Sequence, residues 1–294
     1  WAKSIGGVSN DMGWGIIADS SGNVYTTGYF VGTVDFDPGS GTAPLTSIGS
    51  SDIFISKLDS SGNFAGAWSM GGNADDYGYG IFLDATGNIY TTGYFKNTAD
   101  FNPATGVAYP LTSASIGVQD IFISKLDNGG NFLWAKAIGG TAADVGLGIS
   151  LLSTGNVYIT GWFQGTVDFN PDVGTFNLTS RGGSYDVYVC KLDSDGNLVW
   201  ARAMGGTSED IGQAVSVDSS GNVYTTGWFN NRADFDPGAG TTFNLTSSGI
   251  ASDIFISKLN GNGNFVWARA MGGASSADVG YGIARPYWGQ GYTT

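Results

Sequence analysis

The sequence predicts an all-β fold, a β-propeller of four-stranded blades. A Gly-Gly pair recurs along the chain, and each pair is followed by a near-copy of the same block. The pairs end at Gly7, Gly72, Gly140, Gly206 and Gly273, which lie 65, 68, 66 and 67 residues apart. Each block contains short runs of β-branched and aromatic residues and no helical spacing. A β-solenoid is the main alternative, but its coils are shorter and lack up-and-down hairpins.

The first block serves as the template for the first two strands, called a and b. Gly15–Asp19 and Val24–Phe30 are the predicted strands, and Ser20-Ser21-Gly22-Asn23 is the turn between them. Asp and Asn side chains hydrogen-bond to nearby backbone groups, and Gly adopts positive φ without a Cβ clash. The sequence therefore predicts a tight hairpin.

Strands c and d form the second predicted hairpin of the block. Asp52–Leu58 and Phe64–Met70 are the strands, and Asp59–Asn63 is the turn. A polar loop that contains Asp35-Phe36-Asp37-Pro38 is expected to connect strand b to strand c. Two hairpins give four strands per block.

The repeat predicts one array over residues 1–294. Residues 1–7 match strand d of a split blade, four blades follow at 8–72, 73–140, 141–206 and 207–273, and residues 274–294 match the first strands of the split blade. One strand c is missing for five whole blades. Three interpretations remain open: an excerpt of a longer array, a five-bladed ring that closes imperfectly, or a strand supplied by a neighbouring molecule.

Two motifs resemble the bacterial β-propeller repeats of the SBBP type. They read Gly80-Ile81-Phe82-Leu83-Asp84-Ala85-Thr86-Gly87-Asn88-Ile89-Tyr90-Thr91-Thr92-Gly93 and Asp120-Ile121-Phe122-Ile123-Ser124-Lys125-Leu126-Asp127. The resemblance covers nearly the whole chain and implies a propeller in an extracellular or cell-surface setting in bacteria. It implies no reaction. The Asp-Phe-Asp/Asn-Pro loop is an insertion relative to the plainest members, so the resemblance implies no role for it.

The composition argues against several functions. The net charge is −13, which disfavours binding to nucleic acid, and no apolar run is long enough to insert into a membrane. The chain has no histidine and one cysteine, Cys190, at a position that holds serine in other blocks. Because no acidic set breaks the symmetry of the repeat, we expect no catalytic residues and no enzyme activity.

The acidic pairs of the b–c loops are the candidate metal ligands. Oxygen atoms two residues apart on a tight loop can face one Ca²⁺ ion, but two side chains per loop are few for a cation that takes six to eight ligands. The alternative, which we favour, is that each pair caps a turn before proline. The residues are Asp35 and Asp37, Asp100 and Asn102, Asp168 and Asn170, and Asp234 and Asp236.

Recurrent aromatic and basic residues offer two further hypotheses. The aromatic residues pack between blades or form a sugar-stacking surface, and their matching positions favour packing. The residues are Tyr29, Tyr94, Trp162, Trp228, Trp134, Trp200 and Trp267. The lysines of strand c are expected to pair with an Asp of the same blade; they are Lys57, Lys125, Lys191 and Lys258.

The expected function is that of a non-catalytic structural or adhesive module outside the cell. Self-association through the incomplete blade is the expected partner interaction, with Trp1, Ile5 and Tyr292 as the assembly or closure residues. A glycan-dependent or calcium-dependent binding module is the alternative. Ca²⁺ is the one cofactor considered.

Overall fold

The computed structural model describes residues 1–104 and 106–284, and the predicted all-β class is confirmed there. Over these residues the only helix is a three-residue 3-10 turn, η1 (Arg181–Gly183). All strand pairs are antiparallel. The fold is therefore built from hairpins, as the repeat predicts.

Each of four sheets contains the predicted a, b, c and d strands in chain order. The a strands are β1 (Met12–Ala18), β5 (Tyr77–Leu83), β11 (Asp144–Leu151) and β17 (Asp210–Val217). The b strands are β2 (Val24–Asp35), β6 (Ile89–Lys96), β12 (Val157–Gln164) and β18 (Val223–Phe229). The c strands are β3 (Pro44–Leu58), β9 (Gln119–Leu126), β15 (Tyr185–Leu192) and β21 (Asp253–Leu259). The d strands are β4 (Phe64–Gly72), β10 (Phe132–Gly140), β16 (Leu198–Gly206) and β22 (Phe265–Met271).

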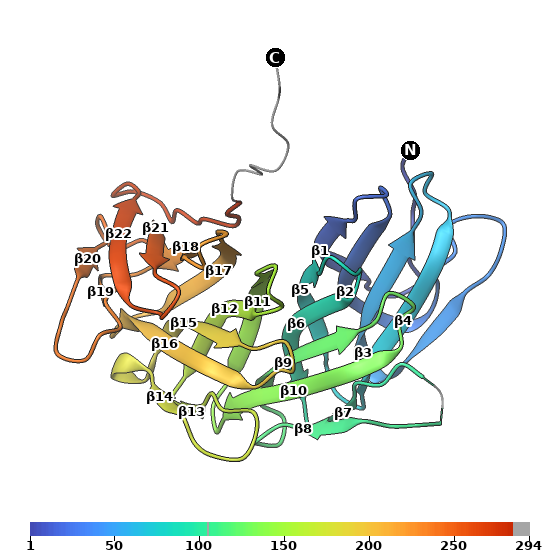
Figure 1. The fold of residues 1–294 in the computed structure, drawn as a ribbon, viewed down its shortest axis with the longest axis horizontal. Coiled ribbons are helices and arrows are strands. Elements are labelled where there is room, and N and C mark those ends of the chain that lie inside the picture. The colour runs from blue at the N-terminus through green and yellow to red at the C-terminus, as the bar shows by residue number, and fades with distance from the viewer. Residues whose placement is uncertain (105, 285–294) are drawn as a thin grey trace.

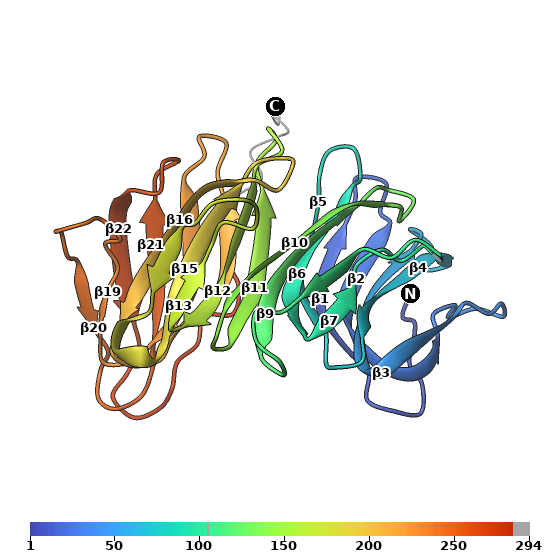
Figure 2. The ribbon, with the colours of Figure 1, turned by 90° about the horizontal axis from the view of Figure 1, so that it is seen from below.

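The four sheets, numbered 1 to 4 along the chain, stand side by side in an arc (Figure 1 and Figure 2). Each a strand packs against the a strand of the next sheet: β1 contacts β5, β5 contacts β11, and β11 contacts β17. The a strands therefore surround the centre of the arc, and the d strands lie on its outer side.

The connection between strands b and c is a hairpin, which corrects the prediction of a polar loop. Three such hairpins are β7 (Thr98–Asp100) with β8 (Pro110–Thr112), β13 (Thr166–Asp168) with β14 (Asn177–Thr179), and β19 (Arg232–Asp234) with β20 (Asn244–Thr246). Each one pairs with the d strand of the preceding sheet, which extends sheets 1 to 3 to six strands. Neighbouring sheets are thus joined by backbone hydrogen bonds as well as by side chains.

The tight turns form as the sequence predicts. At the turn between β1 and β2, Asp19 Oδ1 accepts hydrogen bonds from the backbone N–H groups of Ser21 and Asn23, both at 2.9 Å. Gly22 adopts φ +80°, a conformation that residues with a Cβ rarely adopt. The same side-chain hydrogen bonds recur at the other a–b and c–d turns, with Asn260 as the acceptor between β21 and β22. The exception is the turn between β11 and β12, where Leu152 takes the place of the aspartate.

Three of the four hydrophobic clusters of the described structure lie between sheets, and the fourth lies on sheet 1. One cluster joins Ile53, Ile55 and Met70 of sheet 1 to Phe95 and Phe122 of sheet 2. Equivalent clusters lie between sheets 2 and 3 and between sheets 3 and 4. Cys190 is fully buried in the second of these three clusters, in agreement with a packing role.

Candidate functional site

A cavity of about 1070 Å³ lies at the centre of the arc. The a strands of all four sheets line it, together with residues Tyr281 to Ala284. Because neighbouring sheets contribute matching positions, any difference between the blocks at these positions changes the chemistry of the cavity. We therefore take this cavity as the candidate functional site.

A β-bulge in each a strand points one side chain toward this cavity. In β1 the register shifts between Gly13 and Gly15, so Trp14 has no partner on the neighbouring strand. The same shift occurs in β5, β11 and β17. Bulges of this kind redirect a side chain and are frequent beside functional sites. The bulge residues are Trp14, Tyr79, Leu147 and Gln213, and all four line the cavity.

Glycine is required opposite each bulge. A Cβ added at Gly93 would lie 1.8 Å from the backbone oxygen of Tyr77, and a Cβ added at Gly28 would lie 1.8 Å from that of Met12. No side chain fits at these distances. The recurrent glycine of strand b therefore permits the bulge that positions the cavity residue.

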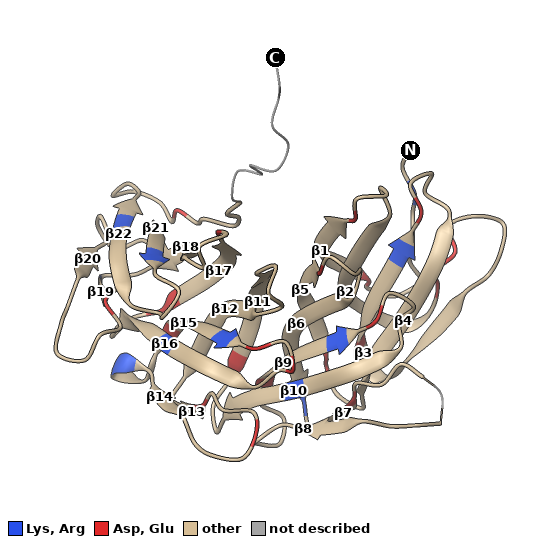
Figure 3. Cartoon of the chain, in the orientation of Figure 1, with Lys and Arg blue, Asp and Glu red and all other residues tan. Residues whose placement is uncertain are grey.

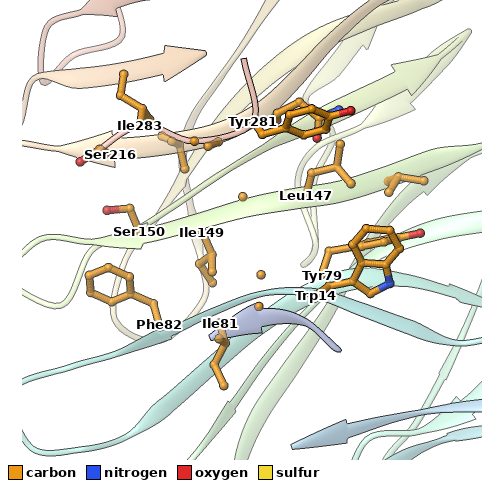
Figure 4. Close-up of a pocket in the computed structure, with 18 of the residues that line it drawn as sticks. Trp14, Tyr79, Ile81, Phe82, Leu147, Ile149, Ser150, Ser216, Tyr281 and Ile283 are labelled. Atoms are coloured by element: carbon orange, nitrogen blue, oxygen red, sulfur yellow. The ribbon is translucent and has the colours of Figure 1, made fainter. Parts of the chain in front are cut away.

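The cavity is aromatic at one end and uncharged throughout its described lining. Figure 4 shows Trp14 beside Tyr79, with Tyr281 on the opposite side and Leu147 between them. The rings of Trp14 and Tyr79 meet edge to face at 5.4 Å, and burial raises the pKa of Tyr79 to about 12. Trp14 is 54% exposed and Tyr281 is 77% exposed. Polar groups come from Gln119, Gln213, Ser150 and Ser216.

The predicted aromatic positions divide between packing and the cavity. Tyr29 stacks on Tyr77 of sheet 2 with ring centroids 4.1 Å apart, which joins two sheets. Tyr94 and Trp162 line the cavity. Trp134 and Trp200 donate hydrogen bonds from Nε1 to backbone oxygens of the following sheet. A sugar-stacking surface remains a prediction.

The predicted metal residues act as caps of the b–c hairpins. Asp168 Oδ1 accepts hydrogen bonds from the backbone N–H groups of Asn170 at 3.0 Å and Phe176 at 2.8 Å. The equivalent bonds form at Asp35, Asp100 and Asp234, and the second member of each pair, Asp37, Asn102, Asn170 or Asp236, accepts a further backbone N–H. No group of three potential metal ligands is found over residues 1–104 and 106–284. Calcium binding at these loops stays the less favoured of the two hypotheses.

Three of the four strand c lysines connect neighbouring sheets, whereas an Asp partner in the same blade was expected. Lys57 Nζ donates to Asn128 Oδ1 of sheet 2 at 2.8 Å and lies 5.0 Å from the centroid of the Tyr25 ring. Lys125 and Lys191 reach backbone oxygens of the next sheet in the same way. Figure 3 shows these basic positions on β3, β9, β15 and β21. None of the four lysines lines the cavity.

Buried aspartates recur as pairs at the boundaries between sheets. Burial raises the pKa of Asp120 to about 6, and burial together with the charge of Asp120 raises the pKa of Asp144 to about 8. Asp120 Oδ1 is buried and has no hydrogen-bond partner. Pairs at Asp52 with Asp76 and at Asp186 with Asp210 repeat the arrangement. Shifted pKa values often mark catalytic sites, but these pairs recur at each of the three boundaries between sheets and lie outside the cavity lining.

The N-terminal closure residues lie against sheet 1. Trp1 Nε1 donates to the backbone oxygen of Ser60 at 3.0 Å, and Ile5 packs against a cluster that includes Phe30 and Phe54. Gly6 forms an isolated bridge with Asp35. Tyr292 lies outside the described residues.

Sequence reasoning missed the bulge residues. Trp14, Tyr79, Leu147, Gln213 and Tyr281 occupy the same place in the repeat, after the first Gly of the a strand, and their side chains differ in size and polarity. A position that varies inside a regular repeat was the available signal.

Residues 199–236 match the family model described as SBBP, beta-propeller repeat. The predicted resemblance is confirmed. The matched SBBP segment runs from strand d of sheet 3 through strands a and b of sheet 4 to the Asp-Phe-Asp sequence of the hairpin that follows.

The chain is similar to two known proteins, and the name of the first describes a repeat protein. The chain is 23% identical, over an alignment of 323 positions, to "Uncharacterized WD repeat-containing protein L264" of Acanthamoeba polyphaga mimivirus. The alignment covers 93% of the chain and 23% of the relative. It is 27% identical over 125 residues to "Regulatory protein FlaEY" of Caulobacter vibrioides, which covers 42% of the chain and 13% of the relative. The chain thus spans less than a quarter of the length of either relative. In the described part of the chain, we find no helix with the length and apolar character of a membrane span.

Proposed function

We propose that this protein is a non-catalytic adhesive module whose sheets are blades of a propeller and whose central cavity binds neutral carbohydrate. The observation that carries the proposal is the group of three aromatic residues at one end of the cavity. Trp14, Tyr79 and Tyr281 present ring surfaces toward one end of an uncharged cavity. We assign the module to the outside of the bacterial cell, as its resemblance to SBBP-type repeats implies.

The chemistry of the lining favours sugars over other ligands. Sugar rings have an apolar C–H face that stacks on aromatic rings, and their hydroxyl groups pair with amide and hydroxyl side chains. Gln119, Gln213, Ser150 and Ser216 supply such groups around the same cavity. The described lining contains no Lys, Arg, Asp or Glu, which disfavours a charged ligand. The net charge of −13 also disfavours anionic glycans.

The same lining supports a binding role without turnover. Glycoside hydrolysis needs two carboxyl groups that flank the scissile bond, and the described cavity residues offer none. The buried aspartate pairs lie instead at the boundaries between sheets. We therefore expect ligand to be held and released unchanged.

A panel of neutral polysaccharides and oligosaccharides tests this function. Binding of purified protein to immobilised glycans should identify at least one neutral ligand, and long incubation should release no reducing ends. Binding restricted to charged glycans, or no binding at all, would refute the carbohydrate proposal. Release of reducing ends would show an enzyme.

A further inference from the structure

An apolar groove of about 360 Å³ lies on the face of sheet 1 that points away from sheet 2. Its apolar floor is made by Ile16, Val24, Phe54 and Leu58 of sheet 1. The segment Trp1–Gly6 forms its rim. We call this surface the sheet 1 groove.

On sheets 2, 3 and 4 the surface equivalent to this groove is covered by residues of the preceding sheet. At the first boundary, Ile53 and Ile55 of strand β3 pack on Ile81, Ile89 and Phe122 of sheet 2. The next two boundaries repeat this contact with Ile121 and Ile123 of β9 and with Val187 and Val189 of β15. In each case the filling residues come from strand c of the preceding sheet.

One position of the a strand is exposed in sheet 1 and buried in the other three sheets. Ile16 of the sheet 1 groove is 71% exposed, whereas its counterparts Ile81, Ile149 and Val215 are 7%, 7% and 6% exposed. The register of the a and b strands makes these four residues equivalent, since each follows the bulge at the same distance. The sheet 1 groove is therefore a strand c site with its apolar floor uncovered in the described structure.

The backbone beside the groove is positioned to pair with such a strand. Trp1–Gly7 docks like strand d, because Trp1 Nε1 contacts Ser60 O at 3.0 Å as Trp134 Nε1 contacts Ser194 O at 3.2 Å. Gly6 pairs with Asp35 as Gly71 pairs with Asp100. Over the described residues, positions 1–5 have no ladder partner, whereas the d strands β4, β10, β16 and β22 pair with strand c. An unpaired edge of this kind is a template for an added strand.

We propose that the sheet 1 groove accepts an extended strand from a second molecule built of the same repeat, by β-augmentation. The strand would carry the sequence Asp-Ile-Phe-Ile-Ser-Lys-Leu, which occurs unchanged at 52–58, 120–126 and 253–259. Its two isoleucines fill the groove, and its backbone pairs antiparallel to Trp1–Ile5. Its lysine reaches Ser60 O, as Lys125 Nζ reaches Ser194 O at 3.4 Å. This inference does not depend on carbohydrate binding.

A labelled peptide with the sequence of residues 119–128 tests the proposal against the whole chain. Fluorescence anisotropy should show saturable binding, and a peptide with Asn at both isoleucine positions should bind at least tenfold more weakly. Ile16→Asp should weaken binding of the first peptide at least tenfold. Ile48→Asp changes an exposed isoleucine outside the groove and should leave binding unchanged.

The controls make each outcome decisive. Equal binding of the two peptides would show that the isoleucines do not fill the groove, and undiminished binding by a folded Ile16→Asp variant would place the peptide elsewhere. Absence of binding by the unmodified protein would also overturn the proposal. Circular dichroism melts of both variants check that each one is folded, and the peptide comparison does not depend on any variant.

Discussion

Aspartate side chains hold both the turns and the boundaries between sheets. Exposed aspartates such as Asp59 accept several backbone N–H groups, and these hydrogen bonds lower the pKa of its carboxyl group. Buried aspartates such as Asp144 accept backbone N–H groups as well, but burial dominates and raises the pKa to about 8. The pKa of an aspartate is therefore lowered at the exposed turns and raised at the buried boundaries between sheets.

The buried pairs predict that stability increases as the pH falls from about 8 toward 5. Their folded pKa values of about 6 to 8 exceed the ordinary value of 3.8, so the folded state binds more protons within this window. Their contribution is complete below 3.8 and is lost as the pH rises through the folded values. Groups with lowered pKa values, such as Asp59, lose their contribution below about 4. Urea unfolding at several pH values should therefore show a maximum between about 4 and 6.

Asp120→Asn tests the origin of that profile. The amide can replace the carboxyl group as acceptor for Ala114 N–H, and its NH₂ group can take the place of the unpartnered Oδ1 near Asp144. We expect the variant to be more stable than the unmodified protein at pH 8, by on the order of 1 kcal/mol, and less dependent on pH. A variant that is destabilised equally at pH 5 and pH 8 would contradict the pairing.

The hairpin caps predict a different result at Asp168. Asp168→Ala leaves the N–H groups of Asn170 and Phe176 without their acceptor and should lower the free energy of unfolding by about 1–3 kcal/mol. Asp168→Asn keeps an acceptor oxygen and should lose much less. Equal losses in the two variants, measured by urea unfolding, would contradict the capping role.

Calcium provides a separate test of the same loops. Because each acidic pair already accepts backbone N–H groups, we expect excess calcium to leave the melting temperature unchanged. A rise in melting temperature that disappears in Asp236→Ala would instead establish the loops as calcium sites. Differential scanning calorimetry with calcium and with a chelator distinguishes these results.

The b–c hairpin is the element that joins one sheet to the next through backbone pairing and buried side chains. Phe169 is fully buried beneath the β13–β14 hairpin, with its ring 5.4 Å from that of Phe163 in an edge-to-face contact. The hairpin itself pairs with β10 of the preceding sheet. Side-chain and backbone contacts thus act together at one boundary.

Phe169→Ala should lower the free energy of unfolding by about 3–5 kcal/mol, because it leaves a cavity between sheets 2 and 3. Val173→Ala changes an exposed residue of the same hairpin and should have little effect. Chemical denaturation of both variants provides the measurement. A loss below about 1 kcal/mol at Phe169 would mean that the hairpin does not lock the sheets.

The four main strands of each block and their tight turns were predictable from the sequence, and the short hairpins between strands b and c were not. Asp-Ser-Ser-Gly-Asn turns and alternating apolar residues identify the main strands from local chemistry alone. The strands of the inserted hairpins have three residues each and pair with a different block, so their partners cannot be found from local sequence. The lysines were misassigned for the same reason, because their partners lie in the next sheet.

At the scale of the whole molecule, residues that recur in each block and residues that differ between blocks have different roles. Residues that recur in each block build the sheets and their boundaries. The bulge residues Trp14, Tyr79, Leu147 and Gln213 differ in each block and line the cavity. Their common orientation depends on a register shift that sequence alone did not reveal, so the cavity became visible only in the structure.

Isothermal titration of the glycan selected by the panel into the unmodified protein and into Trp14→Ala tests the carbohydrate proposal most directly. We expect Trp14→Ala to lower the affinity roughly tenfold, which corresponds to about 1.4 kcal/mol, with no loss of fold because the side chain is half exposed. Tyr109→Ala removes an exposed aromatic ring outside the cavity lining and should bind normally. Equal affinities of the unmodified protein and a folded Trp14→Ala variant would contradict a binding site in the central cavity.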